Sequence, residues 1–305
     1  MSHCFSRVPG HEIGGYVLAV GKNVTKFRVG EAVGVGCMVD SCRACDNCRL
    51  GEEQYCTEGL LLTYNDQHKF PHCVEFNDEG GTPTYGGYSQ TIVVDHNYVV
   101  SIPSNLDLAA ATPLLCAGIT TYSPMMYFGL RANQKFAVYG LGGLGHMGAK
   151  FGVALGAETT VISRGTGKKE SALNELKVQH FVDSTNAAEL RAVEGKFDFI
   201  LDTVSANHDI DALVKLLKTN GKLILVGAPP DKLGFDIFPL IMGRKIISAS
   251  AIGGIRETQE MLDFCGRHNI TCDIEIVSGA KINEAYQRTL KSDVKYRFVI
   301  DTSTF

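Results

Sequence analysis

The amino-acid sequence predicts an α/β protein in which a doubly wound parallel sheet follows a β-rich, barrel-like region. Three observations support this prediction. Between residues 12 and 103, short β-like runs are separated by glycine and asparagine turns. After residue 106, apolar strands alternate with helical segments in the order βαβα, which is typical of a parallel sheet covered by helices. One of these strands leads directly into a glycine-rich loop that opens a helix.

The β-rich region holds four runs that we expect to form strands. They are Ile13 to Val20, Ala32 to Val35, Gln90 to Val94 and Tyr98 to Ile102. In the alternating region, apolar runs of strand length are separated by segments with helical periodicity. The expected strands are Phe136 to Tyr139, Thr159 to Ser163, His180 to Asp183, Phe197 to Asp202, Lys222 to Val226 and Ile246 to Ala251. The expected helices are Gly143 to Leu155, Lys168 to Leu176, Asp209 to Lys218 and Thr258 to His268.

The end of the chain no longer follows this alternation. A helical segment over Ile282 to Leu290 is followed by a strand over Tyr296 to Ile300. We therefore expect the tail to return to the β-rich region and to pack there. This arrangement predicts two domains, one made of residues 1–115 and 255–305 and the other of residues 116–254.

Composition and charge favour small-molecule partners. The chain has 29 Lys and Arg residues against 33 Asp and Glu residues, and it lacks the basic patch of a nucleic-acid-binding protein. No apolar run approaches the about 20 residues that span a bilayer, and the start of the chain does not have the pattern of a secretory signal. We therefore expect no nucleic-acid or membrane partner and a cytoplasmic location. In such a chain, ten cysteines indicate metal binding rather than disulfides.

The loop after the first strand of the alternating region reads Gly-Leu-Gly-Gly-Leu-Gly at residues 140–145. Between a strand and a helix, this pattern predicts a dinucleotide-binding loop. Gly140 makes the tight turn, Gly142 lets the backbone approach the pyrophosphate, and Gly145 lets helix and strand pack closely. Gly143 and Leu144 complete the loop, where the helix N-terminus attracts the phosphates. The alternative is a glycine-rich turn that binds nothing, which the six-strand context disfavours.

The second strand of the alternating region ends without the acidic residue that would hold the ribose 2′-hydroxyl of NAD. It ends instead at Ser163, which is followed by Arg164 and then by Lys168 and Lys169. Cations and hydroxyls suit the 2′-phosphate of NADP, for which arginine is the better bidentate partner. The alternative is that the two lysines form a solvated helix start. We favour NADP(H) because cations at a helix N-terminus are unfavourable by themselves, and a bound anionic ligand would offset this.

Four cysteines lie close together in the spacing C-x2-C-x2-C-x7-C. They are Cys42, Cys45, Cys48 and Cys56. Four thiolates fill the tetrahedral shell of Zn²⁺ and leave no open position, so the pattern predicts a structural zinc that stabilises a loop with few apolar residues. An iron–sulfur cluster has a different spacing, and a nucleic-acid zinc finger lacks its helical His ligands and basic face here. We expect Cys37, just outside the cluster, to be a small buried apolar residue rather than a fifth ligand.

Several further segments occur together in this chain. They are Pro9-Gly10-His11-Glu12, Gly36 to Cys42, Gly86-Gly87-Tyr88-Ser89, Pro113 to Gly118, Gly140 to Gly148 and Tyr296 to Asp301. With these segments, essentially the whole chain resembles the plant-type cinnamyl alcohol dehydrogenases and their bacterial aldehyde-reductase relatives. The resemblance implies a GroES-like catalytic domain beside a Rossmann nucleotide-binding domain. It also implies zinc-dependent hydride transfer between NADP(H) and a primary alcohol or aldehyde.

The same resemblance implies a second, catalytic zinc. His11 and Cys116 match two of the family's ligands, and Glu12 matches its acidic residue beside the metal. Without the family, a lone His and a lone Cys would more often be structural residues. The resemblance further places Thr120 and two backbone segments near the cofactor. These segments are Val226-Gly227-Ala228 and Ser250-Ala251-Ile252. In relatives the last strand of the parallel sheet pairs across a dimer axis, so we expect a homodimer.

The family's remaining ligand lies in a C-G-x-C-H-[ST]-D segment upstream of the G-H-E motif, and the residues before His11 contain no such segment. We therefore expect an N-terminally shortened catalytic domain. His3 and Cys4 are conceivable substitutes for the ligand, but their spacing from His11 is not that of the family. His72 and Cys73 lie in a stretch that we expect to be a surface loop, and two such residues are a weak signal for a third metal site. The alternative function is a catalytically impaired, NADP-binding homologue that holds only the structural zinc.

Overall fold

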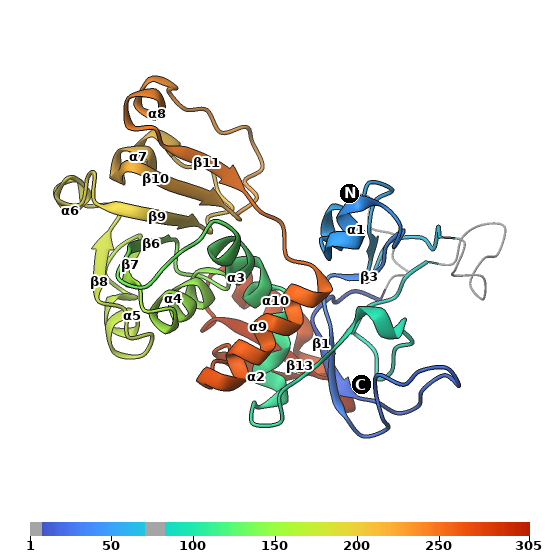
Figure 1. Cartoon of the computed structure of the whole chain (residues 1–305). Coiled ribbons are helices and arrows are strands. Elements are labelled where there is room, and N and C mark those ends of the chain that lie inside the picture. Colours follow the sequence, from blue (N-terminus) through green and yellow to red (C-terminus); the bar gives the residue numbers. More distant parts are fainter. Residues whose placement is uncertain (1–7, 71–82) are drawn as a thin grey trace. The chain divides into compact units, whose positions relative to one another are not determined.

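The computed structural model describes residues 8–70 and 83–305 of the chain (Figure 1). The chain divides into two compact units, one made of residues 1–119 and 252–305 and the other of residues 120–251. Each unit has its own sheets, helices and buried core. No helix in the described ranges is long and apolar enough to cross a membrane.

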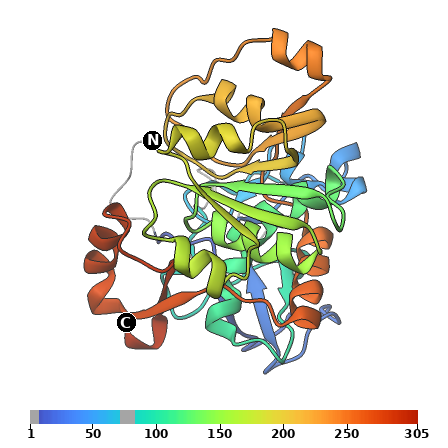
Figure 2. The same ribbon diagram turned by 90° about the vertical axis from the view of Figure 1, so that its left-hand side faces the viewer.

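The second unit is built on a six-stranded sheet whose neighbouring strands all pair in parallel (Figure 2). Its strand order is β11-β10-β9-β6-β7-β8. The strands are β6 (Lys135–Tyr139), β7 (Glu158–Ser163), β8 (His180–Asp183), β9 (Phe197–Asp202), β10 (Leu217–Leu225) and β11 (Ile246–Ala249). The chain runs outward from β6 to β8, returns to β9 beside β6, and runs outward again to β11. Such an order reverses between β6 and β9, and nucleotides bind at the carboxyl ends of the strands at that point.

Helices connect these strands and pack on them. They are α3 (Ala117–Tyr127), which begins in the first unit, α4 (Gly145–Ala154), α5 (Lys169–Asn174), α6 (Ala187–Ala192), α7 (Ile210–Leu216) and α8 (Phe238–Gly243). Side-chain caps mark where two of them begin. The Asp209 carboxylate accepts from the backbone N–H of Ala212 at the start of α7, and the Asn186 side chain caps α6 in the same way.

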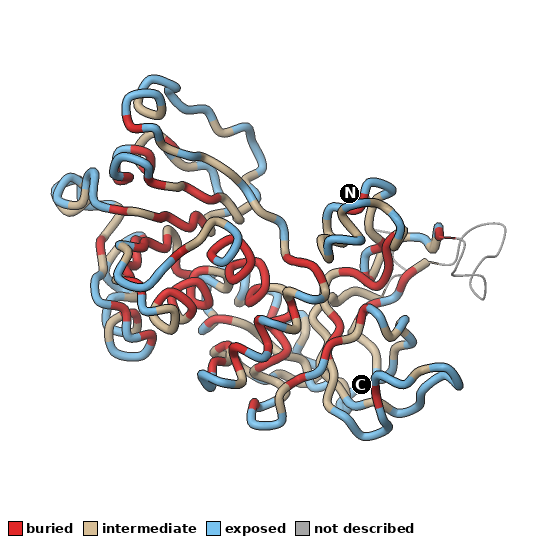
Figure 3. The backbone as a smooth tube through the Cα atoms, in the orientation of Figure 1, coloured by how far each residue is buried: buried red, intermediate tan, exposed pale blue. Residues whose placement is uncertain are grey.

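The core of this unit consists of apolar side chains from the central strands and from α7, which are almost fully buried (Figure 3). They include Ala137, Ile162, Ile200, Leu213, Val214 and Leu223. Because parallel strands are covered on both faces, their sequences are continuous apolar runs rather than alternating ones. This explains why the sequence reveals the strands so clearly.

The described residues of the first unit form three small sheets. The largest is antiparallel and has the order β1-β2-β5, with β1 (Ile13–Tyr16), β2 (Ala32–Val35) and β5 (Val99–Ser101). The others pair β3 (Met38–Asp40) with β4 (Leu61–Leu62), and β12 (Ile274–Ser278) with β13 (Arg297–Asp301). Its helices are α1 (Asp46–Leu50), α2 (Leu108–Ala111), α9 (Ile255–His268) and α10 (Ile282–Leu290). Short 3-10 turns are η1 (Glu53–Tyr55), η3 (His96–Tyr98), η4 (Thr112–Leu115), η5 (Gly279–Lys281) and η6 (Thr302–Thr304).

The structure confirms the predicted α/β class and all six strands of the parallel sheet, with shifts of a few residues at their ends. It also confirms that the tail packs with the β-rich region, because β13 pairs with β12 in the first unit. The strand predicted over Gln90 to Val94 is wrong: this segment forms no strand. The strand predicted from Ile13 ends at Tyr16, because only residues 13–16 find partners on β2.

The last strand of the parallel sheet, β11, lies at its edge and has a partner only in β10. Large apolar side chains before and on this strand are exposed. They are Phe238, Ile241, Met242 and Ile246. The homodimer expected at this strand stays a prediction.

Candidate metal and nucleotide sites

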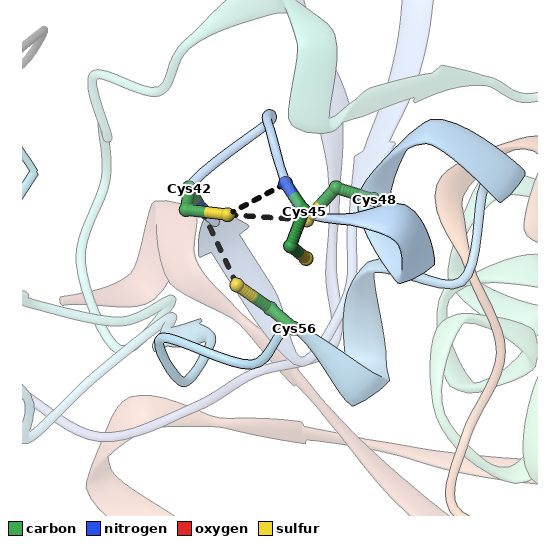
Figure 4. A group of neighbouring side chains, drawn as sticks. All are labelled: Cys42, Cys45, Cys48 and Cys56. Atoms are coloured by element: carbon green, nitrogen blue, oxygen red, sulfur yellow. Dashed lines mark hydrogen bonds between the residues drawn. The ribbon is translucent and has the colours of Figure 1, made fainter.

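The four clustered cysteines converge on one small space in the first unit (Figure 4). The ligand atoms of Cys42, Cys45, Cys48 and Cys56 all lie within 4.8 Å of one another. Cys42 and Cys45 precede α1, Cys48 lies on it, and Cys56 follows η1. Backbone N–H groups point at two of the sulfurs, from Cys45 to Cys42 Sγ at 3.3 Å and from Cys42 to Cys56 Sγ at 3.4 Å. Four thiolates at this separation fit a tetrahedral zinc ion, so the structure supports the predicted structural site.

Polar contacts stabilise this loop from outside. Arg43 lies between Asp40, which is buried, and Asp95, which is exposed, and contacts a carboxylate oxygen of each at 2.8 Å. Ser41 Oγ lies 3.1 Å from Cys48 Sγ and 2.6 Å from the hydroxyl of Tyr98. Backbone N–H groups, that of Cys48 foremost, lower the pKa of Cys45 to about 6. N–H groups directed at sulfur favour the thiolate, which is the form that binds metal.

A second group of metal-binding side chains lies elsewhere in the first unit. His11, Cys37 and Cys116 have ligand atoms within 4.8 Å of one another. The sequence identified His11 and Cys116 through the family resemblance. As expected, Cys37 is not a fifth ligand of the four-cysteine site. The expectation that it is a buried apolar residue is wrong, because its side chain is half-buried and its sulfur lies close to the other two ligand atoms. The signal was the sequence Gly-Cys directly after a strand, which is not specific enough to be interpreted alone.

Backbone pairing places His11 in this group. Gly10 has φ +102°, and the N–H groups of Gly87 and Tyr88 donate to the carbonyl oxygens of Gly10 and Pro9, both at 2.9 Å. A Cβ atom on Gly86 would lie 2.1 Å from the oxygen of Gly10, so this approach requires glycine. The ring of His11 stacks on Tyr64, with 5.9 Å between ring centroids. The glycine pair at residues 86 and 87 therefore determines where the G-H-E motif lies.

Hydrogen bonds within the group shift its pKa values. The thiol of Cys37 donates to Cys116, and this bond holds the pKa of Cys116 well below its usual value. The same bond, with burial, raises the pKa of Cys37. The hydrogen bond to Cys116 also raises the pKa of His11, although burial opposes it.

Glu12 is directed away from a ligand role by an ion pair. Its carboxylate binds the guanidinium of Arg297 on β13, and both side chains are half-buried. Burial raises the pKa of Glu12, and the positive charge of Arg297 opposes that shift. The sequence left open whether Glu12 is an alternate ligand or a supporting residue, and this contact favours the supporting role.

The glycine loop of the second unit follows β6 and opens α4. Gly140 has φ +93°, a conformation that favours glycine. A Cβ on Gly145 would lie 2.0 Å from the oxygen of Gly140, whereas a Cβ on Gly142 would meet nothing within 4 Å. Gly143 and Leu144 lie in the same turn and are half-buried. The loop therefore has the tight turn, the close packing and the open approach that a bound pyrophosphate requires.

The loop after β7 carries the predicted cations. Ser163 is buried at the end of the strand, and Arg164 and Lys169 are exposed. Lys168 is half-buried, and its Nζ donates a hydrogen bond of 2.6 Å to the carbonyl oxygen of Leu141 in the glycine loop. Burial, assisted by the charge of Arg164, lowers the pKa of Lys168. Lys168 is thus held beside the glycine loop, and the alternative of a merely solvated helix start does not describe it.

The remaining predicted cofactor residues follow the carboxyl ends of neighbouring strands or lie on α3. Val226 to Ala228 follow β10, and the N–H groups of Val226 and Gly227 donate to the oxygen of Asp202 at the end of β9. Ser250 and Ala251 follow β11, Thr120 is buried on α3, and Ile252 begins the return of the chain to the first unit. His3, Cys4, His72 and Cys73 lie outside the described residues.

Comparisons with known proteins agree with this geometry. A model of the alcohol dehydrogenase GroES-like domain matches residues 2–104, and a model of the zinc-binding dehydrogenase matches residues 143–267. A probable formaldehyde dehydrogenase of Bacillus subtilis is 51% identical over 300 residues, which make up 98% of this chain and 83% of that protein. These similarities give no support to the alternative of a catalytically impaired homologue.

Two solved structures are similar along almost the whole chain. A cinnamyl alcohol dehydrogenase of Sorghum bicolor has a TM-score of 0.92 at 44% identity, covering 98% of this chain and 83% of that one. CAD from Helicobacter pylori, complexed with NADP(H), has a TM-score of 0.89 at 41% identity, covering 99% of this chain and 84% of that one. Both the folds and the sequences match, which confirms the expected family. The chain belongs to the zinc-binding, medium-chain alcohol dehydrogenase family, whose GroES-like and Rossmann-type units it contains.

Proposed function

We propose that this protein is an NADP(H)-dependent dehydrogenase that interconverts primary alcohols and aldehydes at a catalytic zinc held by His11 and Cys116. The observation that supports this most strongly is that these two side chains, far apart in the sequence, have their ligand atoms within 4.8 Å of each other. The donor set of imidazole and thiolate suits zinc. Residues 1–115 and 255–305 form the catalytic domain, and residues 116–254 bind the nucleotide.

When bound, zinc polarises the substrate oxygen and NADP(H) donates or accepts the hydride. The protein's own residues position both groups. His11 is oriented by stacking on Tyr64, and Cys116 already favours the thiolate form that a metal requires. Glu12 carries its negative charge beside the metal ligands while Arg297 holds its carboxylate.

The choice of NADP(H) rests on the loop after β7. Strand β7 ends at Ser163 and is followed by Arg164, where an NAD-binding protein would have an acidic residue. Lys168 stands half-buried next to the glycine loop, so two cations are available for a 2′-phosphate. The complex of CAD from Helicobacter pylori with NADP(H) supports the same choice.

The substrate class follows from what the relatives share. They include a probable formaldehyde dehydrogenase and cinnamyl alcohol dehydrogenases, whose named substrates differ in size but are all aldehydes or primary alcohols. We therefore propose that the protein acts on this functional group, with aromatic and small aldehydes both as candidates.

The test is aldehyde-dependent oxidation of NADPH by the purified protein, measured with cinnamaldehyde and with formaldehyde. We expect turnover with NADPH at a kcat/KM at least about tenfold above that with NADH. Cys116→Ser should remove the turnover, whereas Cys265→Ala, which changes a buried thiol on α9 outside both metal groups, should retain it. Absence of turnover in the wild-type protein with either aldehyde and either cofactor would refute the proposal.

A further inference from the structure

The group formed by His11 and Cys116 includes a third potential ligand that the family resemblance does not assign. The sulfur of Cys37 lies within 4.8 Å of both the His11 nitrogen and the Cys116 sulfur. A catalytic zinc site normally has three protein ligands and one open position for the substrate. One imidazole and two thiolates make such a set, so the described residues supply all three protein ligands that a catalytic zinc needs.

The local structure holds Cys37 in this place. Gly36 packs so closely on the loop before Cys116 that a Cβ atom on it would lie 2.9 Å from the carbonyl oxygen of Leu115. Gly34 on β2 makes a similar approach, with 2.7 Å from its ideal Cβ to a methyl carbon of Leu115. Two glycines thus let the end of β2 lie directly against the residue that precedes Cys116.

The other side of Cys37 is fixed by Thr63, which follows β4. The backbone N–H of Thr63 donates to the carbonyl oxygen of Cys37 at 3.2 Å, and the hydroxyl of Thr63 donates to the carbonyl oxygen of Gly36. The carbonyl oxygens of Gly36 and Cys37 therefore both have hydrogen-bond partners in Thr63. The thiol is left facing Cys116 and His11, where a metal ion would bind.

We propose that Cys37 is a direct ligand of the catalytic metal, which is then held by His11, Cys37 and Cys116. The inference rests on the proposed function, since it concerns the same metal. Binding requires the Cys37 thiol to release its proton to solvent. A bond between the metal and the Cys37 sulfur would then replace the hydrogen bond that this thiol donates to Cys116 in the free protein.

Two other assignments explain the structure less well. Glu12 is adjacent to His11, but its carboxylate is bound to Arg297 and would have to leave that ion pair to reach a metal. Cys37 is only a few residues from Cys42, but it is not among the four sulfurs that surround the structural site. A disulfide between Cys37 and Cys116 is the remaining rival, because two neighbouring thiols can be oxidised.

The test is to replace zinc by Co²⁺ and to record the thiolate-to-cobalt charge-transfer absorption together with the number of metal ions per chain. The variants are Cys37→Ser, Cys116→Ser and the control Cys265→Ala. We expect Cys37→Ser to weaken binding of the second metal by more than the about 10–100-fold typical of losing a supporting residue. We also expect it to lower the charge-transfer absorption, while the four-cysteine site keeps its metal and the control matches the wild type.

The possible outcomes separate the two proposals. If the wild type binds a single metal ion and Cys116→Ser changes nothing, the proposed function fails. If Cys116→Ser loses the second metal but Cys37→Ser keeps it with an unchanged cobalt spectrum, the function stands and the role of Cys37 is overturned. Titration of thiols in the unfolded, unreduced protein tests the rival. If the wild type contains a disulfide that is missing in Cys37→Ser, the assignment of Cys37 as a metal ligand is also overturned.

Discussion

The Nζ atom of Lys168 lies 2.6 Å from the carbonyl oxygen of Leu141 and donates a hydrogen bond to it. This bond joins the loop after β7 to the glycine loop after β6. In a nucleotide-binding sheet of this order, the glycine loop receives the pyrophosphate and the loop after the second strand receives the ribose. The bond therefore holds the two parts of the predicted NADP(H) site next to each other within the second unit.

Substitutions at two glycines of the loop test its role in folding and its role in nucleotide binding separately. In Gly145→Ala, the new Cβ would lie 2.0 Å from the oxygen of Gly140, so we expect a loss of about 1–3 kcal/mol in the free energy of unfolding. In Gly142→Ala, the Cβ meets no protein atom within 4 Å, so stability should stay within about 0.5 kcal/mol. The same methyl group would occupy the approach to the pyrophosphate, and the Kd for NADPH should rise at least about tenfold. Denaturant titration and fluorescence titration with NADPH measure the two effects, and unchanged NADPH affinity in Gly142→Ala would argue against this role of the loop.

Arg164 should determine the preference for NADP(H) over NAD(H). A hydrogen bond to a charged group contributes about 1.5–3 kcal/mol, which is about tenfold or more in affinity. We expect Arg164→Ala to raise the KM for NADPH by that factor while the KM for NADH stays nearly constant. Lys196→Ala is the matched control, because this exposed lysine precedes β9 and lies at the amino end of the strand. A parallel change in both KM values would indicate a general effect on the loop instead.

Asp183 at the end of β8 should stabilise the loop after β7, which carries Arg164 and Lys168, in a manner that depends on pH. Its carboxylate accepts hydrogen bonds from the backbone N–H and hydroxyl of Thr185, which lower its pKa, and from the N–H of Gly165. Because the folded-state pKa is depressed, the stabilisation is complete above the ordinary value of 3.8 and is lost as the pH falls through the lower value. Asp183→Asn should therefore lower Tm at neutral pH, and the difference from wild type should narrow below pH 3.8. A difference in Tm that is independent of pH would show that the charge is not responsible.

The four-cysteine loop should depend on its metal. Few apolar side chains support residues 41–57, so metal binding supplies much of the local folding free energy. We expect a zinc chelator, or Cys45→Ser, to increase amide hydrogen exchange in this loop. Exchange in β6 and β9 should stay unchanged, because the second unit has its own core. Equal protection of the loop with and without zinc would contradict the structural role.

Local sequence patterns predicted the parts of the molecule whose determinants are local. The four cysteines and the glycine loop each lie within a short segment, and the strands of the parallel sheet are buried on both faces, so each is visible in the sequence. The pairing of Cys37 with His11 and Cys116 depends on the approach of Gly36 to Leu115, which joins distant segments. The segment from Gln90 to Val94 has the composition of a strand but finds no partner. Strands in the first unit are decided by such tertiary pairing, which composition does not reveal.

The number of zinc ions per chain, in the wild-type protein and in Cys116→Ser, tests the central claim most directly. Elemental analysis of the purified proteins, normalised to protein concentration, gives both numbers. We predict two zinc ions in the wild type, one in each site, and a single ion in Cys116→Ser, retained by the four-cysteine cluster. Equal zinc content in the two proteins would contradict a catalytic metal at His11 and Cys116.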